Sequence, residues 1–158
     1  MQGHISLRPV EASDLPVFFE QQLDPEATRL AAFPSREREA FFKHWTTRIL
    51  VNPDNACCTI LFDGQVTGYI GAWTDPETKE RLIGYWFGRQ FWGRGIATAA
   101  VIQFLQSELI RPLGAHVAKH NLGSIRVLEK AGFVRIGEDE YTPPGGAKFE
   151  EYVYRLGS

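Results

Sequence analysis

The sequence predicts an α/β domain with one mixed sheet and helices on both faces. Residues 57–87 contain three strand-like segments joined by short turns, the pattern of an antiparallel meander. After residue 87 the pattern changes, and a loop with three glycines at residues 88–95 leads into a helix-like segment. Shorter strand-like and helix-like segments follow to the end, and this order of elements indicates a mixed sheet covered on both sides.

The N-terminal third is expected to supply one strand and two helices. Residues 5–7 alternate as a short strand, and a helix is expected to start at Ser13 and Asp14. The pairs Asp24-Pro25 and Phe33-Pro34 are expected to break the chain. A second helix is expected to begin at Ser35, with one apolar face made of Phe41, Phe42, Trp45 and Ile49.

The meander and the C-terminal half follow from turn signals. Asp63-Gly64 predicts a two-residue hairpin turn between the strands, and Gly132 stands where a left-handed helix cap belongs. The expected strands are residues 57–62, 66–73, 81–87, 115–118, 133–136 and 152–156, with helices at 96–109 and 124–131 and a loop at 142–148.

Composition limits the class of protein. The 158 residues are expected to form a single domain, residues 1–158. A net charge of −2 with mixed signs gives no patch for nucleic acid, and no apolar run is long enough for a membrane span. Cys57 and Cys58 are adjacent, a spacing that rarely permits a disulfide between them. We therefore expect a soluble protein of the cytoplasm.

The segment Trp92-Gly93-Arg94-Gly95-Ile96-Ala97 predicts an anion site. Glycines let backbone N–H groups point inward together, and the following helix adds its unpaired N–H groups and positive end. The segment does not fit a Walker loop, because no Lys-Ser or Lys-Thr follows, nor a dinucleotide fingerprint, because Thr98 replaces the third glycine. The alternative interpretation is a glycine-rich turn that only caps a buried helix.

Two blocks of the sequence resemble the GNAT superfamily of acetyltransferases. The stretch from Gly84 to Thr98 is similar to the superfamily's acetyl-CoA loop, with Trp92 in place of the usual Gln or Arg. The second block, Asn121 to Phe133, is similar to the pattern Asn-x-x-Ser-x-x-x-x-Glu-Lys-x-Gly-Phe of the RimJ/RimL-like branch. The resemblance implies a largely antiparallel twisted sheet whose fourth and fifth strands splay apart.

The resemblance also implies a co-substrate and a set of site residues. Acetyl-CoA is expected to lie between the splayed strands, with its pyrophosphate on the loop and its thioester against the Phe87 N–H. Many GNAT proteins carry a Tyr as proton donor where this sequence has Leu128. The resemblance to the RimL-like branch implies instead that Ser124, the serine of the Asn-x-x-Ser pattern, donates the proton to the leaving thiolate. The alternative is that Ser124 only caps its helix. The implied CoA-binding residues are Phe87, Trp92, Gly93, Arg94, Gly95, Ile96, Ala97 and Asn121.

A general base is not evident in the sequence. Leu82 stands where related sequences often carry Glu, and the carboxylates at 138–140 and 150 read as surface charges. His44, His116 and His120 lack metal-ligand spacing, so no metal site is expected.

The function implied by the resemblance is acetyl transfer from acetyl-CoA to an amine through a tetrahedral intermediate. The acceptor is either a protein N-terminus or a small-molecule amine, and the protein is expected to be a monomer or homodimer. The alternative is a CoA-binding regulatory module that has lost catalysis, an interpretation favoured by Leu82 and Leu128.

Overall fold

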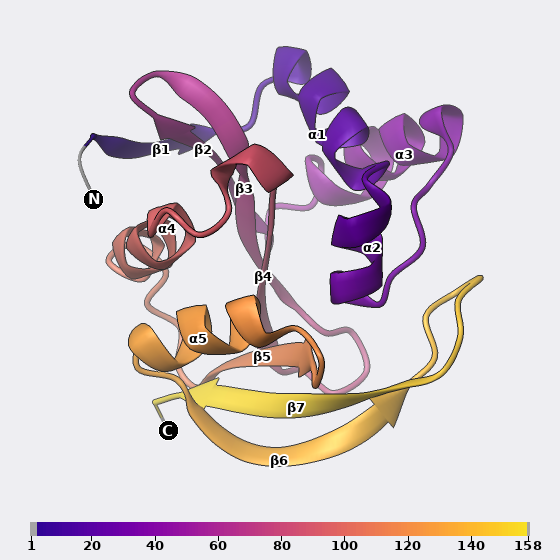
Figure 1. The fold of residues 1–158 in the computed structure, drawn as a ribbon, viewed down its shortest axis with the longest axis vertical. Coiled ribbons are helices and arrows are strands. Elements are labelled where there is room, and N and C mark those ends of the chain that lie inside the picture. Colours follow the sequence, from indigo (N-terminus) through magenta and orange to yellow (C-terminus); the bar gives the residue numbers. More distant parts are fainter. Residues whose placement is uncertain (1–2, 158) are drawn as a thin grey trace.

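The computed structural model describes residues 3–157. A seven-stranded sheet lies at the centre of the fold (Figure 1). The strand order is β1-β2-β3-β4-β5-β7-β6, and every neighbouring pair is antiparallel except β4 and β5, which run parallel. The strands are β1 Ile5–Pro9, β2 Ala56–Phe62, β3 Gln65–Thr74, β4 Arg81–Phe87, β5 Leu113–Ala118, β6 Val134–Tyr141 and β7 Phe149–Leu156.

Helices cover both faces of this sheet, as the sequence predicts. Alternation along β3 divides its side chains between two cores. Ile70 and Ala72 belong to the core under α4 (Ile96–Phe104) and α5 (Leu122–Lys130). Tyr69 packs on the other face, against the buried aromatic side chains of α1 (Leu15–Gln22) and α3 (Arg38–His44).

The meander forms where the turn residues predict it. Asp63 and Gly64 have φ angles of 50° and 80°, the left-handed pair that a two-residue hairpin turn requires. β4 has the predicted bounds, and β3 is one residue longer than predicted at each end. A Cβ on Gly68 would lie 2.0 Å from the Trp86 carbonyl oxygen, so only glycine lets β3 and β4 approach this closely.

The parallel pair β4–β5 is splayed. Its ladder contains only Arg81 opposite Leu113 and Leu82 opposite Gly114. From there the strands diverge, as Figure 1 shows, while β5 stays paired with β7 along its whole length. A gap therefore opens beside the C-terminal half of β4, at residues 83–87.

The N-terminal third breaks at Asp24-Pro25 as predicted, but it contains a helix that the sequence analysis does not predict and another that begins later than predicted. Asp24-Pro25 begins a helix, α2 (Pro25–Ala31), because the Asp24 side chain accepts a hydrogen bond from the Glu26 N–H at 3.1 Å and proline suits the first helical position. The next helix begins at Arg38, three residues later than predicted, and passes into a π-helical turn at Trp45–Ile49. α3 and the π-helical turn together form the predicted apolar face of Phe41, Phe42, Trp45 and Ile49.

The C-terminal half differs from the prediction only at its boundaries. α4 ends at Phe104 instead of residue 109, and β6 continues to Tyr141, five residues beyond the predicted end. Gly132 has a φ of 99°, as expected for a residue that follows the end of a helix. No helix within residues 3–157 is long and apolar enough to cross a membrane.

Candidate functional site

Two cavities meet at the splayed end of β4. The smaller cavity, of about 230 Å³, lies between α2, β4, the glycine loop and the start of α5. The larger cavity, of about 690 Å³, lies between α3, the π-helical turn and the meander. Ala31, Tyr85 and Trp86 line both cavities. A molecule in one cavity would therefore be adjacent to a molecule in the other.

The glycine loop presents unpaired backbone donors. Gly93 and Gly95 have φ angles of 71° and 77°, and Gly95 is the residue that precedes α4. Within residues 3–157, no hydrogen bond is formed by the N–H groups from Gly93 to Ala97. A Cβ on Gly93 would meet nothing within 4 Å, so the space in front of the loop is open. This geometry fits a phosphate or pyrophosphate.

The backbone N–H of Phe87 points into the gap. Gly88 donates from its N–H to the Thr67 carbonyl oxygen at 3.0 Å, which fixes the alternation of the β3–β4 ladder. Phe87 therefore directs its N–H and carbonyl away from β3, toward the side where β5 has diverged. Its carbonyl accepts a hydrogen bond from Trp92 Nε1 at 3.0 Å, which leaves the N–H as a donor aimed at the gap.

Asn121, Ser124 and Tyr85 form a chain of hydrogen bonds across the gap. Asn121 Oδ1 accepts from the Ser124 N–H at 3.3 Å and is the cap of α5. Ser124 is the third residue of the helix, so the alternative that Ser124 itself caps α5 is wrong. The Ser124 hydroxyl instead lies 2.7 Å from the Tyr85 hydroxyl.

Tyr85 keeps its proton at neutral pH. Burial raises the pKa of this phenol to about 12, although its hydrogen bond with Ser124 acts in the opposite direction. The hydroxyl can therefore donate to Ser124, which in turn can donate to an atom in the smaller cavity. Leu128, at the position of the Tyr in many GNAT proteins, is 1 % exposed and belongs to the apolar core.

The structure brings most of the predicted site residues together. Six of them line the smaller cavity: Phe87, Trp92, Gly93, Ala97, Asn121 and Ser124. Arg94, Gly95 and Ile96 do not line it. The Ile96 side chain is fully buried in the core, and the Arg94 guanidinium lies 5.1 Å from the centre of the Phe62 ring. The buried Ile96 can therefore contact a ligand only through its backbone, whereas the exposed Arg94 side chain lies outside the smaller cavity.

The larger cavity is aromatic and basic. Its aromatic lining consists of Phe33, Phe41, Trp45, Tyr69, Trp73, Tyr85 and Trp86. Three basic side chains, Arg36, His44 and Arg48, also line it, and no Asp or Glu of the described chain lines either cavity. Burial, followed by the charges of the two arginines, lowers the pKa of His44. Burial likewise raises the pKa of the Cys57 thiol in this wall to about 12, so that thiol is not a ready nucleophile.

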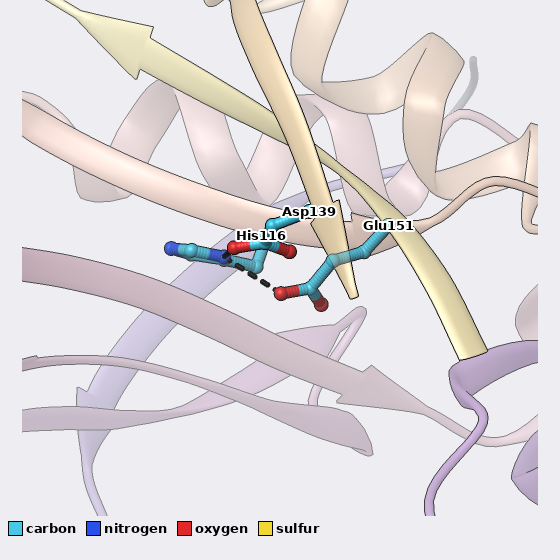
Figure 2. Close-up of side chains that lie close together, drawn as sticks. All are labelled: His116, Asp139 and Glu151. Atoms are coloured by element: carbon cyan, nitrogen blue, oxygen red, sulfur yellow. Dashed lines mark hydrogen bonds and ion pairs between the residues drawn. The ribbon is translucent and has the colours of Figure 1, made fainter. Parts of the chain in front are cut away.

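A separate cluster of possible metal ligands lies on the far part of the sheet. His116, Asp139 and Glu151 come from β5, β6 and β7, and their ligand atoms all lie within 4.8 Å of one another (Figure 2). His116 Nδ1 is 2.9 Å from Glu151 Oε1 and 3.9 Å from Asp139 Oδ2. These residues line neither cavity. Sequence spacing gives no sign of this cluster, because each residue comes from a different strand.

The three groups shift one another's pKa values. The hydrogen bond with Glu151 raises the pKa of His116. Burial, followed by its contact with Glu151, raises the pKa of Asp139 to about 6. Burial opposes the ionisation of Glu151, but hydrogen bonds with His116 and Asp139 outweigh it and lower the pKa of Glu151. The charge of a protonated His116 thus partly balances the two carboxylates within the cluster.

Sequence reasoning missed Tyr85 as a site residue and the basic wall of the larger cavity. Tyr85 stands in the Gly-Tyr-Trp-Phe run of β4, where alternation with Trp86 places it on the α5 face. This alternation along the strand could have indicated that Tyr85 faces α5 and Ser124. Arg36 and Arg48 gave none, because they come from a segment without a recognisable motif.

Comparison with known proteins identifies the family. Residues 4–134, most of the chain, match the family model described as the acetyltransferase (GNAT) domain. No significant match was found among curated proteins.

Solved structures agree with this assignment. A proposed acetyltransferase from T. thermophilus is 28% identical, with a TM-score of 0.77 over 99% of this chain and 87% of that one. The fold is also that of the microcin C7 self-immunity acetyltransferase MccE in complex with acetyl-CoA and AMP, at 18% identity, a TM-score of 0.80 and coverage of 98% and 92%. It is shared by the Vibrio cholerae spermidine N-acetyltransferase in complex with CoA and spermine, at 15% identity, a TM-score of 0.78 and coverage of 95% and 94%. The chain therefore belongs to the GNAT acetyltransferase family.

Proposed function

We propose that this protein transfers the acetyl group of acetyl-CoA to an amine. The observation that carries the proposal is the arrangement at the splay: unpaired N–H groups on the loop, the Phe87 N–H in the gap, and Ser124 bonded to Tyr85 between two cavities. In this proposal the whole chain acts as one domain, in the cytoplasm, with no metal. We also propose that the protein belongs to the RimJ/RimL-like branch of the family, which the sequence resembles.

The smaller cavity would receive the pantetheine arm. The N–H groups of residues 93–97 would hold the pyrophosphate, and the first turn of α4 would add its dipole. Asn121 would fix the start of α5 and with it the position of Ser124. The Phe87 N–H would donate to the thioester oxygen and stabilise the negative charge that develops there.

The larger cavity would receive the amine. Attack by the neutral nitrogen forms the new C–N bond and gives a tetrahedral intermediate, whose collapse breaks the C–S bond. Tyr85 borders both cavities, so its oxygen can take one proton from the attacking nitrogen while its own proton passes to Ser124. Ser124 then protonates the departing sulfur, and the products are an amide and free thiol.

Turnover with a panel of amines tests the proposal. Acetyl-CoA and an accepted amine should give equal amounts of free thiol and acetylated product. Ser124→Ala should lower kcat by at least about tenfold and leave CoA affinity nearly unchanged, because the interaction exists only as sulfur leaves. Binding of CoA without transfer to any amine would instead favour the regulatory module. Equal kcat in the parent and in Ser124→Ala would remove Ser124 from the mechanism.

A further inference from the structure

The larger cavity holds positive charge that the protein does not neutralise. Arg36 lies between α2 and α3, and Arg48 lies in the π-helical turn, so two separate segments contribute an arginine to the lining of one cavity. Among residues 3–157, neither side chain forms an ion pair or a hydrogen bond. Arg8, Arg29, Arg81 and Arg89 each pair with Asp or Glu. Several other arginines of the described chain also lack a carboxylate partner, but only Arg36 and Arg48 among them line this cavity.

The position of Arg36 is fixed by a buried amide. Gln22, in α1, is 9 % exposed, and its side chain bonds to both backbone groups of Arg36. Gln22 Nε2 donates to the Arg36 carbonyl at 2.9 Å, and the Arg36 N–H donates to Gln22 Oε1 at 2.6 Å. A backbone held in this way presents its half-buried side chain from a defined place, which is what a recognition residue requires.

The cavity also selects by shape and polarity. Its lining is mainly aromatic, and it contains no carboxylate to pair with an ammonium group beyond the one that reacts. A polyamine or an aminoglycoside would bring several positive charges to Arg36 and Arg48 and would be repelled. An anionic group would be attracted by the two positive charges and could accept charge-assisted hydrogen bonds from the guanidinium groups.

We infer that the acceptor is a small amine that carries an anionic group and an apolar, preferably aromatic, body. This inference rests on the proposed function and specifies its substrate class. The amine nitrogen lies at the Tyr85 end, where the two cavities meet, and the anionic group pairs with Arg36 and Arg48. A carboxylate and a phosphonate satisfy the same chemistry, so both are tested.

A matched series of acceptors tests the inference. The series is L-phenylalanine, its aminophosphonate analogue, L-phenylalaninamide, phenethylamine and spermidine, each with saturating acetyl-CoA. The two members that carry an anionic group should have a kcat/KM at least about tenfold above that of the members without one, with spermidine the poorest. Faster transfer to the amide, to phenethylamine or to spermidine would overturn the inference while leaving acetyl transfer established.

Variants of the two arginines test whether they cause the preference for anionic acceptors. Arg36→Gln and Arg48→Gln should each raise KM for the anionic acceptors several-fold with little change in kcat, and Arg36→Lys should restore part of the loss. Lys43→Gln removes the same charge from an exposed position of α3 outside the cavity and should change neither value. The melting-temperature shift produced by CoA checks that each variant is folded. A preference for anions that persists in the double Gln variant would contradict the assignment.

Binding separates this inference from the proposed function. Calorimetry on the CoA complex measures the affinity for L-phenylalanine and its phosphonate without any turnover. Anion binding that is lost in the double variant supports the pairing of the anionic group with Arg36 and Arg48, and the absence of any acetylated amine would then count against the proposed function alone. If neither anionic probe binds and neither is acetylated, the inference is wrong.

Discussion

The hydroxyl pair of Tyr85 and Ser124 is the smallest unit on which the proposed chemistry depends. The phenol retains its proton at neutral pH and is hydrogen-bonded to Ser124. In the proposed reaction each hydroxyl needs the other, because Ser124 would carry the proton of the phenol toward the sulfur. Without Tyr85, Ser124 would have no hydrogen-bonded hydroxyl in this aromatic site to replace the proton that it gives to the sulfur. In the proposed mechanism the pair would therefore substitute for the tyrosine that Leu128 replaces.

Tyr85→Phe should lower kcat by about 10- to 100-fold, because the relay loses its central proton carrier. The affinity for CoA should change little, since the ring remains in place and only the hydroxyl is removed. Steady-state kinetics and CoA titration on the same preparation measure both quantities. Tyr154→Phe is the matched control, because it removes a tyrosine hydroxyl from a buried residue that lines neither cavity, and it should leave kcat unchanged. An unchanged kcat in Tyr85→Phe would exclude the relay.

At the scale of elements, the glycine loop and the start of α4 form one unit. The loop's conformation depends on left-handed φ angles at two glycines, and its N–H groups have no partner in the described chain. Such a unit attracts anions whatever its neighbours are. Because the unit lies beside the gap, we propose that this attraction holds the pyrophosphate of CoA.

A pair of variants at Gly93 tests the unit. Asn and Asp have nearly the same shape, and both tolerate a positive φ angle better than most residues, so Gly93→Asn and Gly93→Asp differ mainly in charge. CoA should bind at least about tenfold more weakly to the Asp variant than to the Asn variant. Calorimetric titration with CoA gives both constants. Equal affinities would show that the phosphates lie elsewhere.

The cluster on β5, β6 and β7 gives a prediction about pH. Asp139 faces Glu151 directly across the β6–β7 ladder, and its pKa of about 6 lies above the 3.8 of an ordinary Asp. A raised carboxyl pKa means that the native state favours the protonated form, so this group costs stability as the pH rises above 4. The raised pKa of His116 acts in the same direction, because its contribution is lost as the pH rises above its ordinary value.

Asp139→Asn should therefore stabilise the protein at pH 8 by about 1 kcal/mol, a value reduced for the exposure of Asp139, and by much less at pH 4. Urea denaturation at the two pH values measures the difference. Glu140→Gln serves as the control, because Glu140 pairs with the exposed Lys148 outside the cluster. A destabilised Asp139→Asn at pH 8 would show that the carboxylate binds a cation or pairs with His116 more strongly than it repels Glu151.

At the scale of the whole molecule, the sequence predicts what is encoded locally. The Asp63-Gly64 turn, the bounds of β4 and the loop before α4 depend on neighbouring residues, and each lies where it was expected. The predicted break at Asp24-Pro25 is present, but the helix α2 that begins there was not predicted, because the same pair that ends one helix can begin another.

The unpredicted parts of the site depend on contacts between distant segments. The bond between Tyr85 and Ser124 joins residues 39 positions apart, and that between Gln22 and Arg36 joins a helix to a loop. No periodicity or turn signal records such pairs. The family motifs predict the loop and Ser124, whereas the wall of the larger cavity follows from tertiary structure alone.

The central claim is that the gap between β4 and β5 holds the reacting end of acetyl-CoA, and a crystal structure of the CoA complex tests it most directly. We expect the pyrophosphate on the N–H groups of residues 93–97 and the pantetheine arm beside β4. The sulfur should lie within about 3.5 Å of the Ser124 hydroxyl, with the Phe87 N–H free to reach the thioester oxygen. A pyrophosphate bound away from this loop, or an arm that lies outside the gap, would contradict the account.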